Sequence, residues 1–213
     1  MEITFDAALF DNDGVLVDSH VEVDRAWRQI AEEFGLDIDM LLSELAGVRS
    51  IDTLCRYLPP DRASHAAAQL EELEVELANL TRPLAGALKL TSQLPTNKWS
   101  IVTSASRRIA EARWRGAAIT VPPSTVTAGD VTHGKPHPEP FLIAARSLGV
   151  DPTRCVVFED SASGGAAGLA AGATVIAVGN QTWEVTPSAR VQNLSEVVME
   201  TDGRGRLLLR LEN

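Results

Sequence analysis

Residues 7–19 have the sequence Ala-Ala-Leu-Phe-Asp-Asn-Asp-Gly-Val-Leu-Val-Asp-Ser. The first four residues form a short apolar run typical of a buried strand, and Asp-Asn-Asp-Gly is typical of a turn that ends one. Asp11 and Asp13 are two residues apart on an extended segment, so both carboxylates point to one side while Asn12 points away. Carboxylates this close repel each other unless a cation lies between them. The stretch therefore predicts a strand that places two acids at one edge of a sheet.

Short apolar strands alternate with helices after Pro83, which predicts an α/β fold with a doubly wound parallel sheet. Ligands bind such a sheet at the carboxyl ends of its strands. We expect strands at 7–10, 100–104, 125–128, 155–158 and 174–178, and helices at 106–115, 138–148 and 162–171.

Residues 16–83 interrupt this alternation after its first strand. One apolar face of helical period begins at Val23, and a second stripe runs from Ala66 to Leu80, with Glu74 among the acidic residues off it. We expect no strand in this segment. The prediction is a helical cap domain of residues 16–83, inserted into an α/β core of residues 1–15 and 84–213.

The composition argues against several functions. The net charge of −10 argues against a nucleic-acid-binding surface, which needs clustered Lys and Arg, and gives no support for binding to an anionic membrane. No apolar run approaches the ~18 residues of a membrane span, and the N-terminus lacks the regions of a signal peptide. Cys55 and Cys155 are too few for a disulfide framework or a zinc site, and we expect buried thiols. We expect a cytoplasmic protein, a monomer or weak homodimer, that acts on a small molecule.

Polar residues stand at the ends of the predicted strands. Asp11 and Asp13 follow the first strand, Ser104 ends another, and Glu159 and Asp160 follow a third. These four carboxylates supply only oxygen ligands, which suits Mg²⁺. The sequence holds no His or Cys cluster at these positions to indicate zinc.

Two further residues extend this set. The hydroxyl of Ser104 and the backbone N–H groups after it would form an anion site at a helix N-terminus, whereas Thr103 should face the opposite side of the strand. Lys135 is one of only three lysines, and Gly134-Lys135-Pro136 is not a Walker loop because no GxxxxGK is present. A lysine between Gly and Pro in a short loop favours a role in the site.

Four stretches resemble the motifs of the haloacid-dehalogenase-like superfamily. Residues 10–19 are similar to its first motif, DxDG[TV]LxDS, and residues 101–104 to its second. Residues 134–136 resemble the third motif and residues 157–161 the fourth. The motifs occur in the family's order, and the similarity spans nearly the whole chain.

The resemblance implies a mechanism. Asp11 would be the nucleophile that forms an aspartyl-phosphate, and Asp13 the general acid and base. Asp11, the backbone carbonyl of Asp13, and Asp160 would bind Mg²⁺, with Glu159 in or beside that set. Ser104 and Lys135 would hold the phosphoryl oxygens, and Asn12 and Ala105 would also contact the substrate.

Enzymes of the same superfamily with other activities differ from this sequence at particular residues. Dehalogenases lack the second aspartate that stands here as Asp13, and phosphonatases need a cap lysine, which residues 16–83 lack. β-Phosphoglucomutases carry a histidine on the first cap helix where this chain has Val23, although His20 is about one helical turn away. Mutase activity therefore stays open as the alternative.

Short stretches favour one branch of the superfamily. Residues 23–28, 46–50 and 99–104 resemble the sugar- and polyol-phosphate phosphatases, which include 2-deoxyglucose-6-phosphate and glycerol-phosphate phosphatases. In that branch Arg49 would bind substrate hydroxyls or phosphate. The resulting hypothesis is a magnesium-dependent phosphatase that acts on a small sugar or polyol phosphate.

Overall fold

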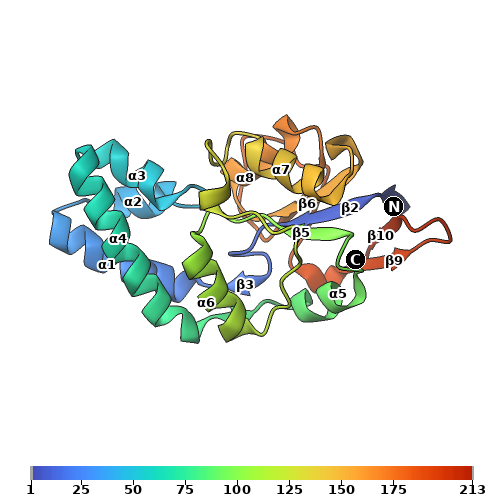
Figure 1. The fold of residues 1–213 in the computed structure, drawn as a ribbon, viewed down its shortest axis with the longest axis horizontal. Coiled ribbons are helices and arrows are strands. Elements are labelled where there is room, and N and C mark those ends of the chain that lie inside the picture. The colour runs from blue at the N-terminus through green and yellow to red at the C-terminus, as the bar shows by residue number, and fades with distance from the viewer. Residues whose placement is uncertain (1, 213) are drawn as a thin grey trace.

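A five-stranded parallel sheet lies at the centre of the larger lobe of the computed structural model, which describes residues 2–212 (Figure 1). The strand order across the sheet is β5 (Trp99–Ile101), β2 (Ala7–Phe10), β6 (Cys155–Glu159), β7 (Thr174–Val178) and β8 (Ala189–Val191).

Side chains alternate across β2, the strand that the first motif predicts. Ala8 and Phe10 pack into one hydrophobic cluster with α5 (Ala87–Gln93) and α6 (Arg107–Ala117). Leu9 packs on the other face with α7 (Glu139–Leu148), in a cluster that also includes α8 (Ala162–Ala170). Figure 1 shows these two pairs of helices on opposite faces of the sheet. The predicted doubly wound sheet is confirmed.

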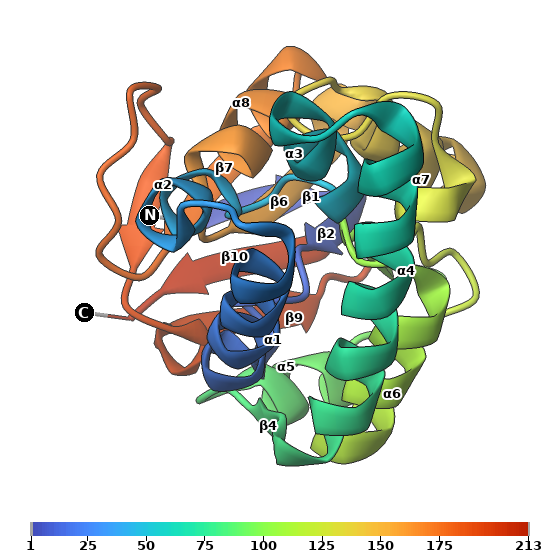
Figure 2. The same ribbon diagram turned by 90° about the vertical axis from the view of Figure 1, so that its left-hand side faces the viewer.

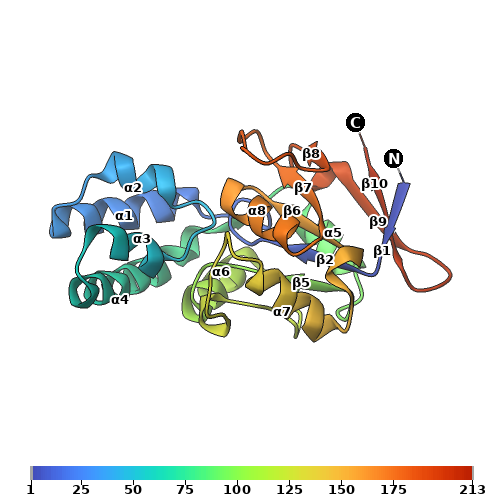
Figure 3. The ribbon, with the colours of Figure 1, turned by 90° about the horizontal axis from the view of Figure 1, so that it is seen from above.

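A second sheet adjoins the core and was not predicted. It is antiparallel, with the order β1 (Glu2–Phe5), β10 (Leu207–Leu211), β9 (Val197–Thr201), and Met199 and Leu209 bury their side chains in the cluster that contains α5. Figure 3 shows it at the end of the molecule remote from the helical lobe. Short 3₁₀ helices occupy Ala78–Leu80, Ala128–Asp130, Pro152–Arg154 and Leu194–Glu196.

Four helices and the loops between them form the smaller lobe, which we call the cap; residues 17–19 and 78–83, which connect it, are the neck, and the rest of the chain is the core. The helices are α1 (His20–Phe34), α2 (Ile38–Glu44), α3 (Ser50–Tyr57) and α4 (Pro60–Leu77). Trp27, Ile30, Leu54 and Leu70 belong to a hydrophobic cluster made within the cap. Figure 2 looks at the molecule from the cap side, with α1 and α4 in front of the sheets. In the chain these four helices lie between β2 and α5.

A short ribbon joins the two lobes. β3 (Val17–Asp18) pairs antiparallel with β4 (Arg82–Pro83), so the two crossings between the lobes lie side by side. The prediction of no strand within 16–83 is therefore wrong at its two ends. Two-residue strands are too short to show the alternation by which strands are recognised in a sequence.

Two other expectations were wrong. The predicted strand at 125–128 is reduced to a single bridge between Val126 and Val102, because Thr127 and Asp130 instead form a capping box that starts a 3₁₀ helix. Cys155 is buried as expected, but Cys55 is exposed; both thiols are free. Among residues 2–212, the helices do not reach the combined length and apolarity that a membrane crossing needs.

The central position of β2 leads to a stability prediction. Leu9 is buried between β2 and the helices on its face, so Leu9→Ala should lower the free energy of unfolding by about 2–5 kcal/mol. Leu88 on α5 is 41% exposed, and Leu88→Ala is the control, expected to change stability by less than about 0.5 kcal/mol. Urea unfolding of both variants measures this, and equal midpoints would show that β2 does not organise the core.

Candidate active site

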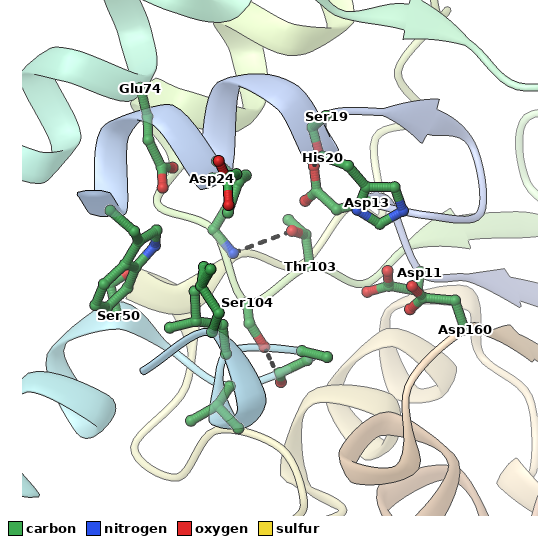
Figure 4. Close-up of a pocket in the computed structure, with 18 of the residues that line it drawn as sticks. Asp11, Asp13, Ser19, His20, Asp24, Ser50, Glu74, Thr103, Ser104 and Asp160 are labelled. Atoms are coloured by element: carbon green, nitrogen blue, oxygen red, sulfur yellow. Dashed lines mark hydrogen bonds between the residues drawn. The ribbon is translucent and has the colours of Figure 1, made fainter. Parts of the chain in front are cut away.

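A cavity of about 380 Å³ lies between the cap and the carboxyl edge of the sheet (Figure 4). The core lines it with Asp11, Asp13, Thr103, Ser104, Ala105, Arg113, Asp160 and Gln181. The neck and cap line it with Ser19, His20, Val23, Asp24, Trp27, Leu42, Leu45, Ala46, Gly47, Val48, Ser50 and Glu74.

Lys135 lies buried beneath the cavity and joins three strands. Its ammonium donates hydrogen bonds to the carboxylates of Asp11 and Glu159, and to the carbonyl oxygen of Val102 at 2.9 Å. Burial alone would lower the pKa of Lys135, but the adjacent carboxylates of Asp11 and Glu159 raise it above its ordinary value. Lys135 is therefore a permanent cation beside Asp11.

Three carboxylates gather around this ammonium. Oxygen atoms of Asp11, Glu159 and Asp160 lie within 4.8 Å of one another. Burial, and then the charge of Glu159, raises the pKa of Asp11 well above its usual range and that of Asp160 to about 8. One ammonium does not balance two buried acids and the partly buried Asp160, so the site fits a bound divalent cation, and an oxygen-only donor set suits Mg²⁺.

Glu159 differs from the other two acids in its contacts. Its Oε1 accepts from Lys135, and its Oε2 accepts from the backbone N–H of Ser161 at 3.1 Å and from the Ser161 hydroxyl at 2.9 Å. Gly164 packs so closely against this carboxylate that an added Cβ would overlap it. Glu159 thus braces Lys135 from below, while Asp11 and Asp160 line the cavity.

Asp13 is held by side chains of the core and of the neck. Its Oδ1 accepts from the hydroxyl of Ser19 at 2.6 Å and from Nη1 of Arg113 at 2.9 Å, and its Oδ2 accepts from Asn12 at 3.1 Å. The amide of Asn12 also accepts from Trp114 at 2.8 Å and is buried within the core. Any contact of Asn12 with a ligand would therefore use its backbone.

The segment after β5 forms the wall opposite the acids. Ser104 donates from its hydroxyl to the carbonyl oxygen of Gly47 at 2.7 Å, and Thr103 Oγ1 accepts from the N–H of Ala105 at 3.0 Å; Figure 4 draws both bonds as dashed lines. The expectation that Thr103 faces away from the site is wrong. β5 ends at Ile101, so strand alternation no longer applies to these residues.

Arg49 lies outside the cavity. Its Nε donates to Asp52 at 2.6 Å and its Nη1 to the carbonyl oxygen of Val131 at 3.4 Å. The side chain also covers Gly134, next to Lys135 in the chain. This geometry gives Arg49 a contact with the loop that carries Lys135, where the sequence analysis expected a contact with substrate.

Sequence analysis missed Arg113 and Glu74. Both are buried, and they form an ion pair between Nη2 and Oε2 at 2.9 Å. Glu74 was placed off the apolar stripe of its helix, yet it is four residues after Leu70, a spacing that puts both on one face. In both cases the sequence held a detectable signal, a charged residue at a position on the apolar face of a helix. Arg113 stands between Ala112 and Trp114, and Glu74 follows Leu70 by four residues.

Comparison with known proteins identifies the class. The model of the haloacid dehalogenase-like hydrolases matches residues 5–172. The chain is 41% identical to hexitol phosphatase A of Escherichia coli, over 80% of this chain and 81% of the relative. It is 33% identical to glycerol-1-phosphate phosphohydrolase 2 of Saccharomyces cerevisiae, over 84% of this chain and 76% of the relative.

The chain belongs to the haloacid dehalogenase-like hydrolases. The solved structure of β-phosphoglucomutase from Clostridium difficile has the same fold, with a TM-score of 0.79 and 26% identity, and covers 89% of this chain and 92% of its own. The resemblance to this family and the prediction of an enzyme, a phosphoric monoester hydrolase, are confirmed.

The loop between α2 and α3 carries the next prediction. Gly47 has φ +74° and packs so that an added Cβ would overlap the hydroxyl of Ser161, whereas Gly35 has φ +67° with open space around it. Gly35→Ala and Gly47→Ala should each cost about 1–2 kcal/mol of stability, because L-residues disfavour positive φ. Only Gly47→Ala should also lift the loop off the core.

Hydrolysis of 4-nitrophenyl phosphate distinguishes the two variants. We expect Gly47→Ala to lower kcat/KM by about tenfold or more, because the cavity no longer closes, and Gly35→Ala to keep the parent value within about twofold. Equal values for the two variants would show that contact of this loop with the core does not matter for turnover.

Proposed function

We propose that the protein is a magnesium-dependent phosphatase that hydrolyses a small sugar or polyol phosphate monoester through an aspartyl-phosphate on Asp11. The observation that carries this proposal is the juxtaposition of Asp11, Asp160 and buried Lys135 at the base of a cavity roofed by the cap. The names of the two phosphatase relatives support the substrate class.

Asp11 is the nucleophile in this proposal. Lys135 contacts its Oδ1, and the charge of this ammonium opposes the rise in the pKa of Asp11 that burial causes. An oxygen of Asp11 attacks phosphorus in line, and the bond from phosphorus to the substrate oxygen breaks as the aspartyl-phosphate forms. Water then attacks the phosphorus and releases inorganic phosphate and free Asp11.

Asp13 transfers the proton in both steps. It donates a proton to the leaving alkoxide in the first step and takes one from the attacking water in the second. Its Oδ1 already accepts two hydrogen bonds and its Oδ2 only the longer one from Asn12, so Oδ2 is the oxygen suited to this transfer.

The donor set for the metal follows from the geometry above. Asp11, the backbone carbonyl of Asp13, and Asp160 would hold Mg²⁺, and Glu159 would orient Lys135 beside them. A bound Mg²⁺ neutralises charge on the transferring phosphoryl group. Ser104, Ala105 and Lys135 would contact the phosphoryl oxygens from the other side.

The cap would contact the part of the substrate that leaves. His20, Asp24 and Ser50 line the cavity with groups that can bind hydroxyls, and Trp27 adds an aromatic side chain to the lining. Such a wall suits a polyol or sugar better than an apolar alcohol.

A phosphosugar mutase is the second candidate. The likeness to β-phosphoglucomutase and the presence of His20 at the cavity favour it. Val23 lines the cavity at the position where the mutases carry their histidine, and no lysine lies between residues 16 and 83, which favours the phosphatase. A mutase would interconvert two sugar phosphates without releasing inorganic phosphate.

Phosphate release tests the proposal. Hexitol, glycerol, fructose and 2-deoxyglucose phosphates should release inorganic phosphate with Mg²⁺ and not with a chelator. Ca²⁺ should inhibit, since its longer bonds and higher coordination number let Asp11 bind it through both oxygens. Asp11→Asn should retain no more than a few per cent of the turnover, and the exposed Asp61→Asn should retain all of it.

Three outcomes would overturn the proposal. Full activity in the chelator would exclude the metal, and a highly active Asp11→Asn variant would exclude the covalent intermediate. Conversion of one sugar phosphate into another without phosphate release would favour the mutase.

A further inference from the structure

Arg113 connects Asp13 to the cap. Its side chain is 3% exposed, and its two terminal nitrogens donate to different carboxylates, Nη1 to Asp13 and Nη2 to Glu74, each at 2.9 Å. Arg113 lies on α6 of the core, whereas Glu74 lies on α4 of the cap. One guanidinium therefore spans the interface between the lobes at the wall of the cavity.

This network is costly to bury. Removing two charges from water often costs more than their attraction returns, and apolar residues of similar size would commonly fill the same space without loss of stability. Burial raises the pKa of Glu74 to about 7 even though Arg113 acts in the opposite direction. Packing alone does not account for the pair, whereas the contact of Arg113 with Asp13 does.

Building on the proposed function, we propose that Arg113 is a positioning residue for Asp13. Arg113 and Ser19 together occupy Oδ1, which turns Oδ2 of Asp13 toward the oxygen that gains or loses the proton. Glu74 fixes the guanidinium, so the orientation of Asp13 depends on the docking of α4 against α6. Arg113 stays protonated throughout, and the proton moves only between Asp13 and the reacting oxygen.

Leaving-group dependence tests this role. Glycerol 1-phosphate needs protonation of its alkoxide, whereas 4-nitrophenyl phosphate releases a stable phenolate without it. Arg113→Lys keeps the charge but loses the two-pronged geometry. It should lower kcat/KM for glycerol 1-phosphate by about 10- to 100-fold, because general acid catalysis contributes a factor of this order. It should lower kcat/KM for 4-nitrophenyl phosphate by less than about threefold.

Two more variants complete the experiment. Glu74→Gln keeps the shape of the side chain. It should lower kcat/KM for glycerol 1-phosphate more than kcat/KM for 4-nitrophenyl phosphate, by a smaller factor than Arg113→Lys does. If Arg113→Lys does not fold, Glu74→Gln serves as the test. Arg108→Met is the control, because Arg108 on the same helix pairs with Glu72 of α4 at the exposed surface. It should leave both rates unchanged.

The outcomes separate the two levels of the proposal. Equal losses on both substrates, or no loss, in folded Arg113→Lys would overturn the positioning role. Failure of the parent protein to release phosphate from any ester would instead overturn the proposed function.

An independent observation concerns the loop that carries Lys135. His133 Nδ1 lies 3.0 Å and His137 Nδ1 lies 3.9 Å from Oε2 of Glu139, and the three ligand atoms all lie within 4.8 Å of one another. Two imidazoles and a carboxylate are ligands for borderline divalent metals such as Zn²⁺, in contrast to the oxygen-only set in the cavity.

The carboxylate of this group is already ordered. Glu139 accepts from the backbone N–H of Thr132 at 2.7 Å and from that of His133 at 3.0 Å, and these bonds hold its pKa at about 2. The backbone N–H of Glu139 donates to His137 Nδ1 at 3.2 Å, so this nitrogen presents a lone pair, and a metal would replace that hydrogen bond. Both histidines are exposed, which leaves room for water to complete the coordination.

We infer that His133, His137 and Glu139 form a Zn²⁺-binding site outside the cavity. Calorimetric titration of the protein with Zn²⁺ in excess Mg²⁺, which occupies the carboxylates of the cavity, tests it. His133→Gln and His137→Gln should each weaken binding by about tenfold or more, whereas His65→Gln, an exposed histidine of the cap, should not. Unchanged binding in both variants, or an equal loss in His65→Gln, would overturn the site.

Discussion

The buried ammonium of Lys135 is the contact on which the rest of the site depends. It joins Asp11 after β2, Val102 after β5 and Glu159 at the end of β6, and so links the carboxyl ends of three adjacent strands. Without it, acids from neighbouring strands would repel one another in a region closed to water. The acids can lie close enough together to suit a metal ion because one lysine lies at their centre.

A second cation repeats this arrangement at the boundary between the lobes. Arg113 lies between Asp13 and Glu74 much as Lys135 lies between Asp11 and Glu159. The two aspartates of the first motif therefore have different partners. Asp11 is bound entirely within the core, whereas Asp13 is bound to Ser19 of the neck and is linked through Arg113 to Glu74 of the cap. This difference fits the proposed division between a fixed nucleophile and a proton donor that needs a closed site.

The sequence predicted the site residues well where they follow the ends of parallel strands. Asp11, Ser104 and Asp160 could be placed at one edge because parallel strands end together, and Lys135 could be added from its place between Gly and Pro in a short loop; the structure brings the four together. Arg49, Arg113 and Glu74 could not be placed, since their partners depend on how the cap packs against the core. The strands β1, β3, β4, β8, β9 and β10 also went unpredicted. β3, β4 and β8 are two or three residues long, and the hairpin of β9 and β10 is completed by β1 from the other end of the chain.

The ribbon of β3 and β4 allows the segment between them to be exchanged during evolution. Because Val17 and Pro83 are paired, the segment between them begins and ends at nearly the same point in space. A replacement segment of another length would change the free energy of closing this loop only slightly. Each doubling of the loop length costs roughly 0.6 kcal/mol. Descendants of such a chain can exchange the whole insert, and with it the choice of molecule to be processed, while Asp11, Lys135 and Glu159 keep their contacts within the core.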